Sequence, residues 1–142
     1  MITREFRRAV EKVIATMGAW SDWLPTVTQS GNVTVTVNGA RYCIIGKLCF
    51  LQANLTITGS GTGGNAVLIG NLPATLSATA MVVGSAKVND TGTGTYAPVV
   101  INTGATALSF FVGGETASLG VTPNFALANN DTIQFSAICE IA

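Results

Sequence analysis

The nine residues CFLQANLTI, at positions 49–57, decide the fold class of this chain. Every odd position in the segment is apolar, and the even positions include Gln52, Asn54 and Thr56. Successive side chains of a β-strand point to opposite faces, so a period of two predicts a strand with one face in a core and the other in solvent. The odd positions of 133–141 are apolar too, and residues 33–38 alternate strictly. These segments predict a chain built mainly from half-buried strands.

Turn residues separate the alternating segments. Asn38-Gly39 lies between two such runs and predicts a tight β-hairpin turn. No helical pattern follows residue 18, and many short strands with frequent turns are typical of a sandwich or barrel. We therefore expect residues 19–142 to form an antiparallel, jelly-roll-like β-sandwich. Further strands are expected near 66–70, 79–88, 96–102 and 106–112, with loops at 59–64, 89–94, 113–114 and 129–131.

Residues 1–18 have a different pattern and predict an amphipathic helix that ends near Gly18. Apolar residues recur at spacings of three and four, which places them on one helix face. A helix this short is marginal alone in water, so its apolar face must be covered. It either packs on the β domain or pairs with copies of itself as the neck of a trimer. The apolar positions are Ile2, Phe6, Ala9, Val10, Val13, Ile14 and Met17, of which Phe6, Val10, Val13 and Met17 are the expected neck contacts.

Charged residues make up only 10% of the chain, against about 25% in an average soluble domain. The seven basic and seven acidic residues balance to a formal net charge of zero. This balance predicts no nucleic-acid partner. No apolar run approaches the roughly 20 residues needed to span a bilayer, so no membrane insertion is expected either. A monomer with this few charged residues is poorly protected against association. We therefore expect other subunits to cover part of the surface.

The search for catalytic or metal-binding groups returns little. The chain has no histidine, which removes the commonest general base and metal ligand, so we expect no enzyme, no metal and no cofactor. A carboxylate pair that meets only in space, as in a glycosidase, stays open. Residues 59–64 match the dinucleotide-binding glycine pattern, but a strand-like segment follows, so a hairpin loop is predicted. The acids beyond the helix are scattered: Asp22, Asp90, Glu115, Asp131 and Glu140.

The three cysteines are expected to be reduced, because the N-terminus does not resemble a signal peptide. An odd count without CxxC spacing argues against a disulfide framework or a zinc site. Cys49 and Cys139 fall on apolar strand faces and predict buried thiols.

One segment, 89–96, has the composition of a saccharide-binding loop. Short polar side chains supply adaptable hydrogen bonds, and an aromatic ring supplies a stacking face. The alternative is a solvated loop with a tyrosine at a strand edge. Trp20 and Trp23 either stack on a sugar or anchor the base of the domain. The candidate receptor-binding residues are Asn89, Asp90, Thr91, Thr93 and Tyr96.

Three segments together resemble the terminal head domains of bacteriophage tail fibres and tail spikes. WLPTVT at 23–28 resembles their W-x-P-T strand, and GARYCIIGKLCFLQA at 39–53 resembles the strand pair around Y-x-x-I-G. LANNDTIQFS at 127–136 resembles their final strand. The resemblance covers most of residues 20–142.

This resemblance implies a homotrimeric head that binds a bacterial surface receptor, commonly a glycan. It also implies contact with other virion tail proteins, a place in the virion tail, and assembly in the bacterial cytoplasm. The family's receptor contacts lie in variable loops, so no binding residue transfers by motif. A full fibre has a shaft and a virion-attachment domain, so a very short fibre protein or a fragment is expected. Two alternatives remain: a structural trimerisation cap without receptor contact, and a polysaccharide depolymerase.

Overall fold

The computed structural model describes residues 3–16, 18–77, 79 and 82–142, which form one helix and an 11-stranded sheet. Helix α1 spans Arg4–Thr16. The strands are β1 (Ser21–Asp22), β2 (Thr26–Thr28), β3 (Asn32–Val33), β4 (Val35–Ile45), β5 (Leu48–Ile57), β6 (Leu68–Gly70), β7 (Val83–Asp90), β8 (Gly94–Tyr96), β9 (Val99–Thr103), β10 (Ala107–Phe111) and β11 (Thr132–Glu140). The predicted fold class, mainly β with one N-terminal helix, is confirmed.

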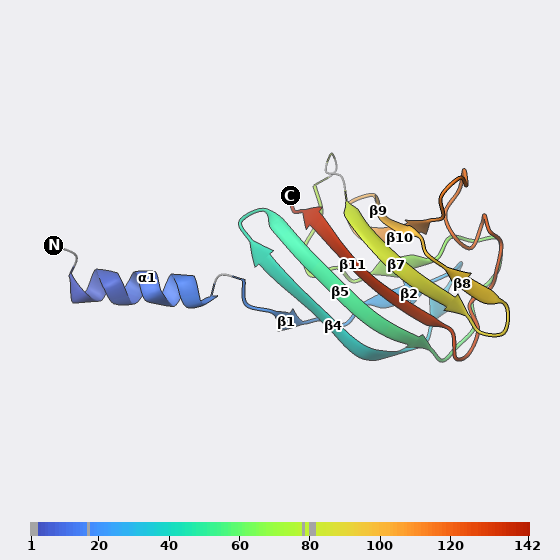
Figure 1. Ribbon diagram of the computed structural model, residues 1–142, viewed down its shortest axis with the longest axis horizontal. Coiled ribbons are helices and arrows are strands. Elements are labelled where there is room, and N and C mark those ends of the chain that lie inside the picture. The colour runs from blue at the N-terminus through green and yellow to red at the C-terminus, as the bar shows by residue number, and fades with distance from the viewer. Residues whose placement is uncertain (1–2, 17, 78, 80–81) are drawn as a thin grey trace.

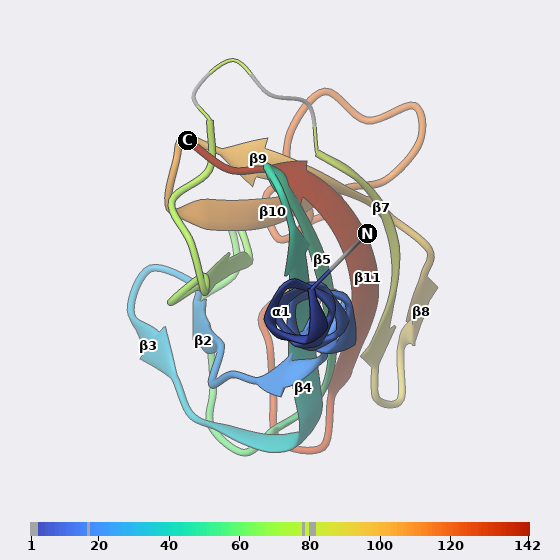
Figure 2. The same ribbon diagram turned by 90° about the vertical axis from the view of Figure 1, so that its left-hand side faces the viewer.

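The strands form one continuous antiparallel sheet that curls into a half-barrel (Figures 1 and 2). Its order is β1-β4-β5-β11-β7-β9-β10-β6-β2-β3, and β8 pairs with β7. Because the sheet curls, the strands at its two ends face each other across a shared interior, as the end-on view in Figure 2 shows. We call this part of the chain, residues 19–142, the head.

The core includes the alternate side chains that the sequence pattern predicted for β5 and β11. In β5 the residues Cys49, Leu51, Ala53, Leu55 and Ile57 are buried, and in β11 so are Ile133, Phe135, Ala137 and Cys139. The two strands are paired so that these sets lie opposite each other, as in Leu55 against Ile133. Phe110 of β10 meets Phe135 edge-on at 6.0 Å between ring centroids, which ties β10 to β11. Burying each large side chain stabilises the fold by roughly 1.5–3 kcal/mol.

The predicted hairpin turn at Asn38-Gly39 is wrong. Both residues lie inside β4, where Val37 pairs with Leu55 and Gly39 pairs with Asn54, so Asn38 is the extra residue of a β-bulge. The side-chain amide of Asn38 donates a hydrogen bond of 2.8 Å to the Thr56 hydroxyl. A turn dipeptide inside a long ladder is accommodated by bending the strand.

The β4–β5 turn lies instead at residues 46–47, between the paired residues Ile45 and Leu48. Gly46 has φ of +59°, which the first residue of such a two-residue turn requires.

Helix α1 stands clear of the head (Figure 1). Thr3 caps its start by accepting a hydrogen bond of 3.2 Å from the Phe6 backbone N–H, as N-terminal threonines do. Every residue from Thr3 to Ile14 is exposed, so the alternative in which the helix packs on the sheet is not what forms. Of the expected neck contacts, Phe6 is 57% exposed, Val10 39% and Val13 58%. Ile2 and Met17 lie outside the described residues.

Candidate functional site

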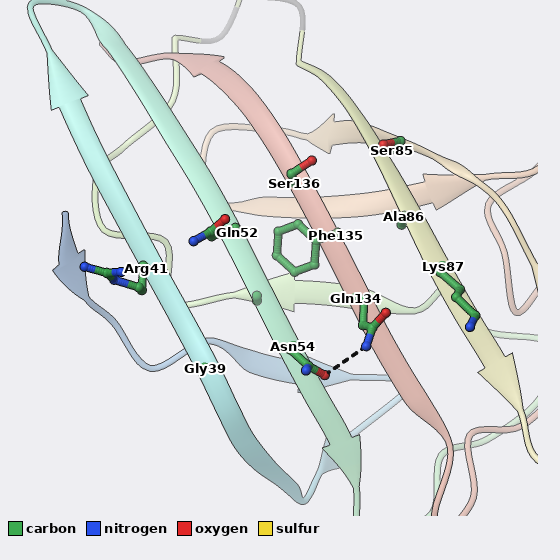
Figure 3. A pocket seen from close by; sticks show the side chains of 11 residues that line it. Gly39, Arg41, Gln52, Asn54, Ser85, Ala86, Lys87, Gln134, Phe135 and Ser136 are labelled. Carbon is green, nitrogen blue, oxygen red and sulfur yellow. Dashed lines mark hydrogen bonds between the residues drawn. The ribbon is translucent and has the colours of Figure 1, made fainter. Parts of the chain in front are cut away.

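The sheet has a polar hollow on its outer face, opposite the core (Figure 3). Strands β4, β5, β11 and β7 lie side by side here, and the residues that point away from the core in one strand pair with their equivalents in the next. Gln134 of β11 pairs with Asn54 of β5 on one side and with Lys87 of β7 on the other. The hollow has a volume of about 570 Å³ and is lined by Gly39, Arg41, Gln52, Ala53, Asn54, Ser85, Ala86, Lys87, Gln134, Phe135 and Ser136.

The chemistry of this hollow is that of amides, hydroxyls and two cations. The Gln134 amide donates a long hydrogen bond of 3.4 Å to Asn54 Oδ1, and both side chains remain exposed (Figure 3). Amides offer both donors and acceptors, so the floor can hydrogen-bond a hydroxyl-rich or carboxylate-bearing group. Arg41 and Lys87 stand on the two flanking strands, and the lining residues include no carboxylate.

Arg41 contacts the segment that leads out of α1. Its Nε lies 3.8 Å from Asp22 Oδ1, and its guanidinium lies 5.9 Å from the centre of the Trp20 ring. Both interactions are largely solvent-exposed and worth little stability individually.

The two tryptophans have separate places. Trp23 is 7% exposed and belongs to the core, as the anchoring alternative predicted. Trp20 is 43% exposed on the outer face.

A second hollow of about 510 Å³ adjoins the first on the side nearer α1. The two share Gln52, Ser85 and Ser136, but the remaining outward side chains of the second hollow are apolar: Trp20, Phe50, Val83 and Ile138. The outer face thus changes from apolar near the helix to polar farther away.

The sequence-predicted receptor residues do come together, but away from both hollows. They lie on the β7–β8 hairpin, at the end of the head farthest from α1 (Figure 1). Thr95 donates a hydrogen bond of 2.9 Å to Asn89 Oδ1, and the Asn89 amide contacts the Thr91 hydroxyl at 3.4 Å. Thr93 at the tip is exposed.

Tyr96, the aromatic residue of this set, is half-buried. Its ring packs against Phe125 with centroids 5.3 Å apart and planes inclined by 33°. One face of the ring is therefore engaged within the protein, and the hairpin offers a ligand mainly hydrogen-bonding groups.

Asp131 gives the hairpin its fixed position, a role that the sequence alone did not reveal. The residue is fully buried, and its two carboxylate oxygens accept hydrogen bonds of 2.8 Å from the backbone N–H groups of Thr91 and Ala128. The Thr91 hydroxyl donates to the Asn130 carbonyl at 2.9 Å. One buried carboxylate thus joins the hairpin to the loop before β11. The Asn-Asp turn pattern at 130–131 was the only signal for it.

The sequence analysis also did not identify the outward residues of the polar hollow as a candidate binding site. Sequence reasoning assigned Gln52, Asn54 and Gln134 to a solvent face, which is confirmed, but the pairing that places them together depends on strand register.

All three cysteines are buried and free, as expected for Cys49 and Cys139. These two are direct partners across the β5–β11 pair. Burial, with a smaller contribution from Cys49, raises the pKa of the Cys139 thiol to about 12, and burial and Cys43 raise the pKa of Cys49. A thiol with a raised pKa is a poor nucleophile at neutral pH.

These raised pKa values predict a loss of stability at high pH. Thiols in the unfolded chain ionise near pH 9, whereas Cys139 in the folded chain ionises near pH 12. The protonated Cys139 thiol therefore makes its full contribution to the free energy of unfolding below pH 9. That contribution is lost as the pH rises from 9 toward 12. Denaturant unfolding at pH 8 and pH 10.5 should show a smaller pH-dependent loss in Cys139→Ala than in the wild type. An identical loss in both proteins would contradict the assignment.

No family model, curated protein sequence or solved structure matches the chain. Within residues 3–16, 18–77, 79 and 82–142, no three histidine, cysteine or acidic side chains gather as metal ligands. The described part of the chain contains no helix long and apolar enough to cross a membrane.

Proposed function

We propose that the chain is a non-enzymatic attachment head of the phage tail-fibre type, which assembles as a homotrimer and binds a bacterial surface glycan. The observation that carries this proposal is the exposed apolar face of α1. Phe6, Val10 and Ile14 lie on one side of a helix that no described part of the head covers, at 57%, 39% and 63% exposure. A solvated apolar stripe on a short helix favours partners.

The apolar stripe of α1 is broad, which favours a bundle of three helices over a bundle of two. Neighbouring positions 9 and 10, and again 13 and 14, are both apolar, which suits a wider seam than that of a two-stranded coiled coil. The proposal also includes jelly-roll packing of the head and a trimer with three-fold symmetry. It further places the chain in the virion tail, in contact with other tail proteins.

The receptor end of the proposal is the β7–β8 hairpin. It lies opposite the neck, as a surface that faces a host cell must, and it carries short polar side chains held by Asp131. Hydrogen-bonding groups that are already fixed lose less entropy when they bind. Three such hairpins on one trimer raise the apparent affinity through multivalency.

Thr93→Arg tests this end of the proposal. We expect the bulky side chain at the exposed tip to lower binding at least tenfold without changing stability. Binding is measured with the labelled chain on arrays of bacterial surface polysaccharides and on bacterial cells. Thr106→Arg is the matched control, because Thr106 is exposed in the β9–β10 turn near the opposite end of the head.

Each outcome of this test is informative. Equal binding by both variants would place the receptor site off the hairpin. A trimer that binds none of the surfaces would favour the structural cap instead, and release of reducing sugar would favour a depolymerase.

A further inference from the structure

The end of the outer face nearest α1 is unusually apolar for a solvated sheet surface. Register places two rows of outward side chains there, across β4, β5, β11 and β7. We call them the apolar rows. The first row holds Ile45, Leu48 and, at its β11 end, Glu140, and the second row holds Cys43, Phe50, Ile138 and Val83, with Trp20 beside them.

These side chains are exposed to a degree that is costly for a monomer. Val83 is 64% exposed, Leu48 46% and Ile138 44%. Of the thirteen large hydrophobic residues that are exposed in the described part of the chain, nine lie on α1 or at this end of the outer face. A concentration of this kind marks an interaction surface.

The apolar rows adjoin the segment that leads out of the helix. Gly18, two residues after the end of α1, lies beside Ile45 and Cys43, so that a Cβ on it would be 3.8 Å from Ile45 Cδ1. Strand β1 then pairs with β4 at the edge of the same face. An assembly that gathers the helices therefore brings the apolar rows of neighbouring copies within reach of each other.

The helix alone is too small to hold such an assembly together. It has 13 residues, fewer than two heptads, whereas coiled coils rest on about three heptads or more. A specific interface involves roughly 20–30 residues, or about 800 Å², on each partner. The 13 residues of the described helix are fewer than this, and the apolar rows are exposed apolar surface next to the helix that can add to the contact.

Charge defines how far the contact extends. Among the outward residues of the two rows, Glu140 at the end of β11 is charged. The polar hollow beyond them carries two cations, Arg41 and Lys87, and covering these charges without a partner would cost their hydration. The contact surface is thus confined to the end of the face near the helix.

We propose that the apolar rows are the head's part of the subunit interface and that another copy of this chain occupies them. This inference rests on the proposed trimer, but it assigns a surface that the helix neck alone does not require.

The test is Val83→Asp in the full chain, with mass and dissociation constant measured by light scattering and sedimentation. We expect the dissociation constant to rise at least tenfold, because the substitution buries an unpaired charge in the contact. Val121→Asp is the matched control, since Val121 is a 38%-exposed valine between β10 and β11 and lies outside the apolar rows. Circular dichroism and thermal melting establish that both variants fold, which the exposure of Val83 favours.

The outcomes separate this inference from the proposed function. Weaker assembly of Val83→Asp, with Val121→Asp unchanged, supports it. If the wild type is a trimer, and Phe6→Asp dissociates it whereas Val83→Asp does not, the inference about the apolar rows is overturned. The proposed helical neck is then still supported. A monomeric wild type overturns both.

Discussion

Phe6→Asp is expected to convert the proposed trimer into monomers whose heads remain folded. Phe6 lies on the apolar stripe in the first turn of α1 and is 57% exposed in the single chain, so the head does not depend on it. In a trimer the substitution would bury three carboxylates next to one another, at a cost of about 3 kcal/mol or more per chain. The helix itself should persist, because an acidic residue in the first turn interacts favourably with the helix dipole.

Light scattering should report about three times the 14.5 kDa chain mass for the wild type and about that single mass for Phe6→Asp. Arg8→Asp introduces the same side chain on the opposite, polar side of α1 and should stay trimeric. A trimer that tolerates Phe6→Asp as well as it tolerates Arg8→Asp would contradict the helical neck.

Asp131→Ala is expected to lower the free energy of unfolding by about 2–4 kcal/mol. The substitution leaves the backbone N–H groups of Thr91 and Ala128 without their acceptor, and an unpaired buried donor costs roughly 1–3 kcal/mol. Because both donors belong to loops at the end far from α1, the variant should also free the β7–β8 hairpin and weaken glycan binding. Denaturant unfolding measures the first effect, and hydrogen exchange at Thr91 measures the second.

Asp22→Ala is the matched control for this variant. The Asp22 side chain is 92% exposed and lies 3.8 Å from Arg41, so its removal should change stability by less than about 0.5 kcal/mol. Equal effects of the two substitutions would show that Asp131 does not anchor the hairpin.

Local patterns predicted most of the strands, because burial on one face imposes a period of two wherever a strand lines the core. Strands β5 and β11 show this most directly, since their buried residues are the alternate positions read from the sequence. The same logic failed at Asn38-Gly39. A turn dipeptide records local backbone preference, and the paired β4–β5 ladder outweighed that preference.

The buried polar contacts were beyond local reasoning for a different reason. Gln29 is 1% exposed, and its side-chain amide donates to the Phe125 carbonyl at 2.8 Å and accepts from the Leu127 N–H at 2.9 Å. The partners lie 96 and 98 residues away along the chain. Nothing near position 29 distinguishes this glutamine from the exposed Gln52.

The sequence by itself determined that this chain is an amphipathic helix followed by a mainly β domain, because both follow from the period of apolar residues along the chain. Only the tertiary structure decided that the helix stands free, that Asp131 anchors the hairpin, and that the outer face divides into a polar hollow and the apolar rows. These features depend on which strands pair and in what register, and a one-dimensional pattern carries no information about register between distant strands.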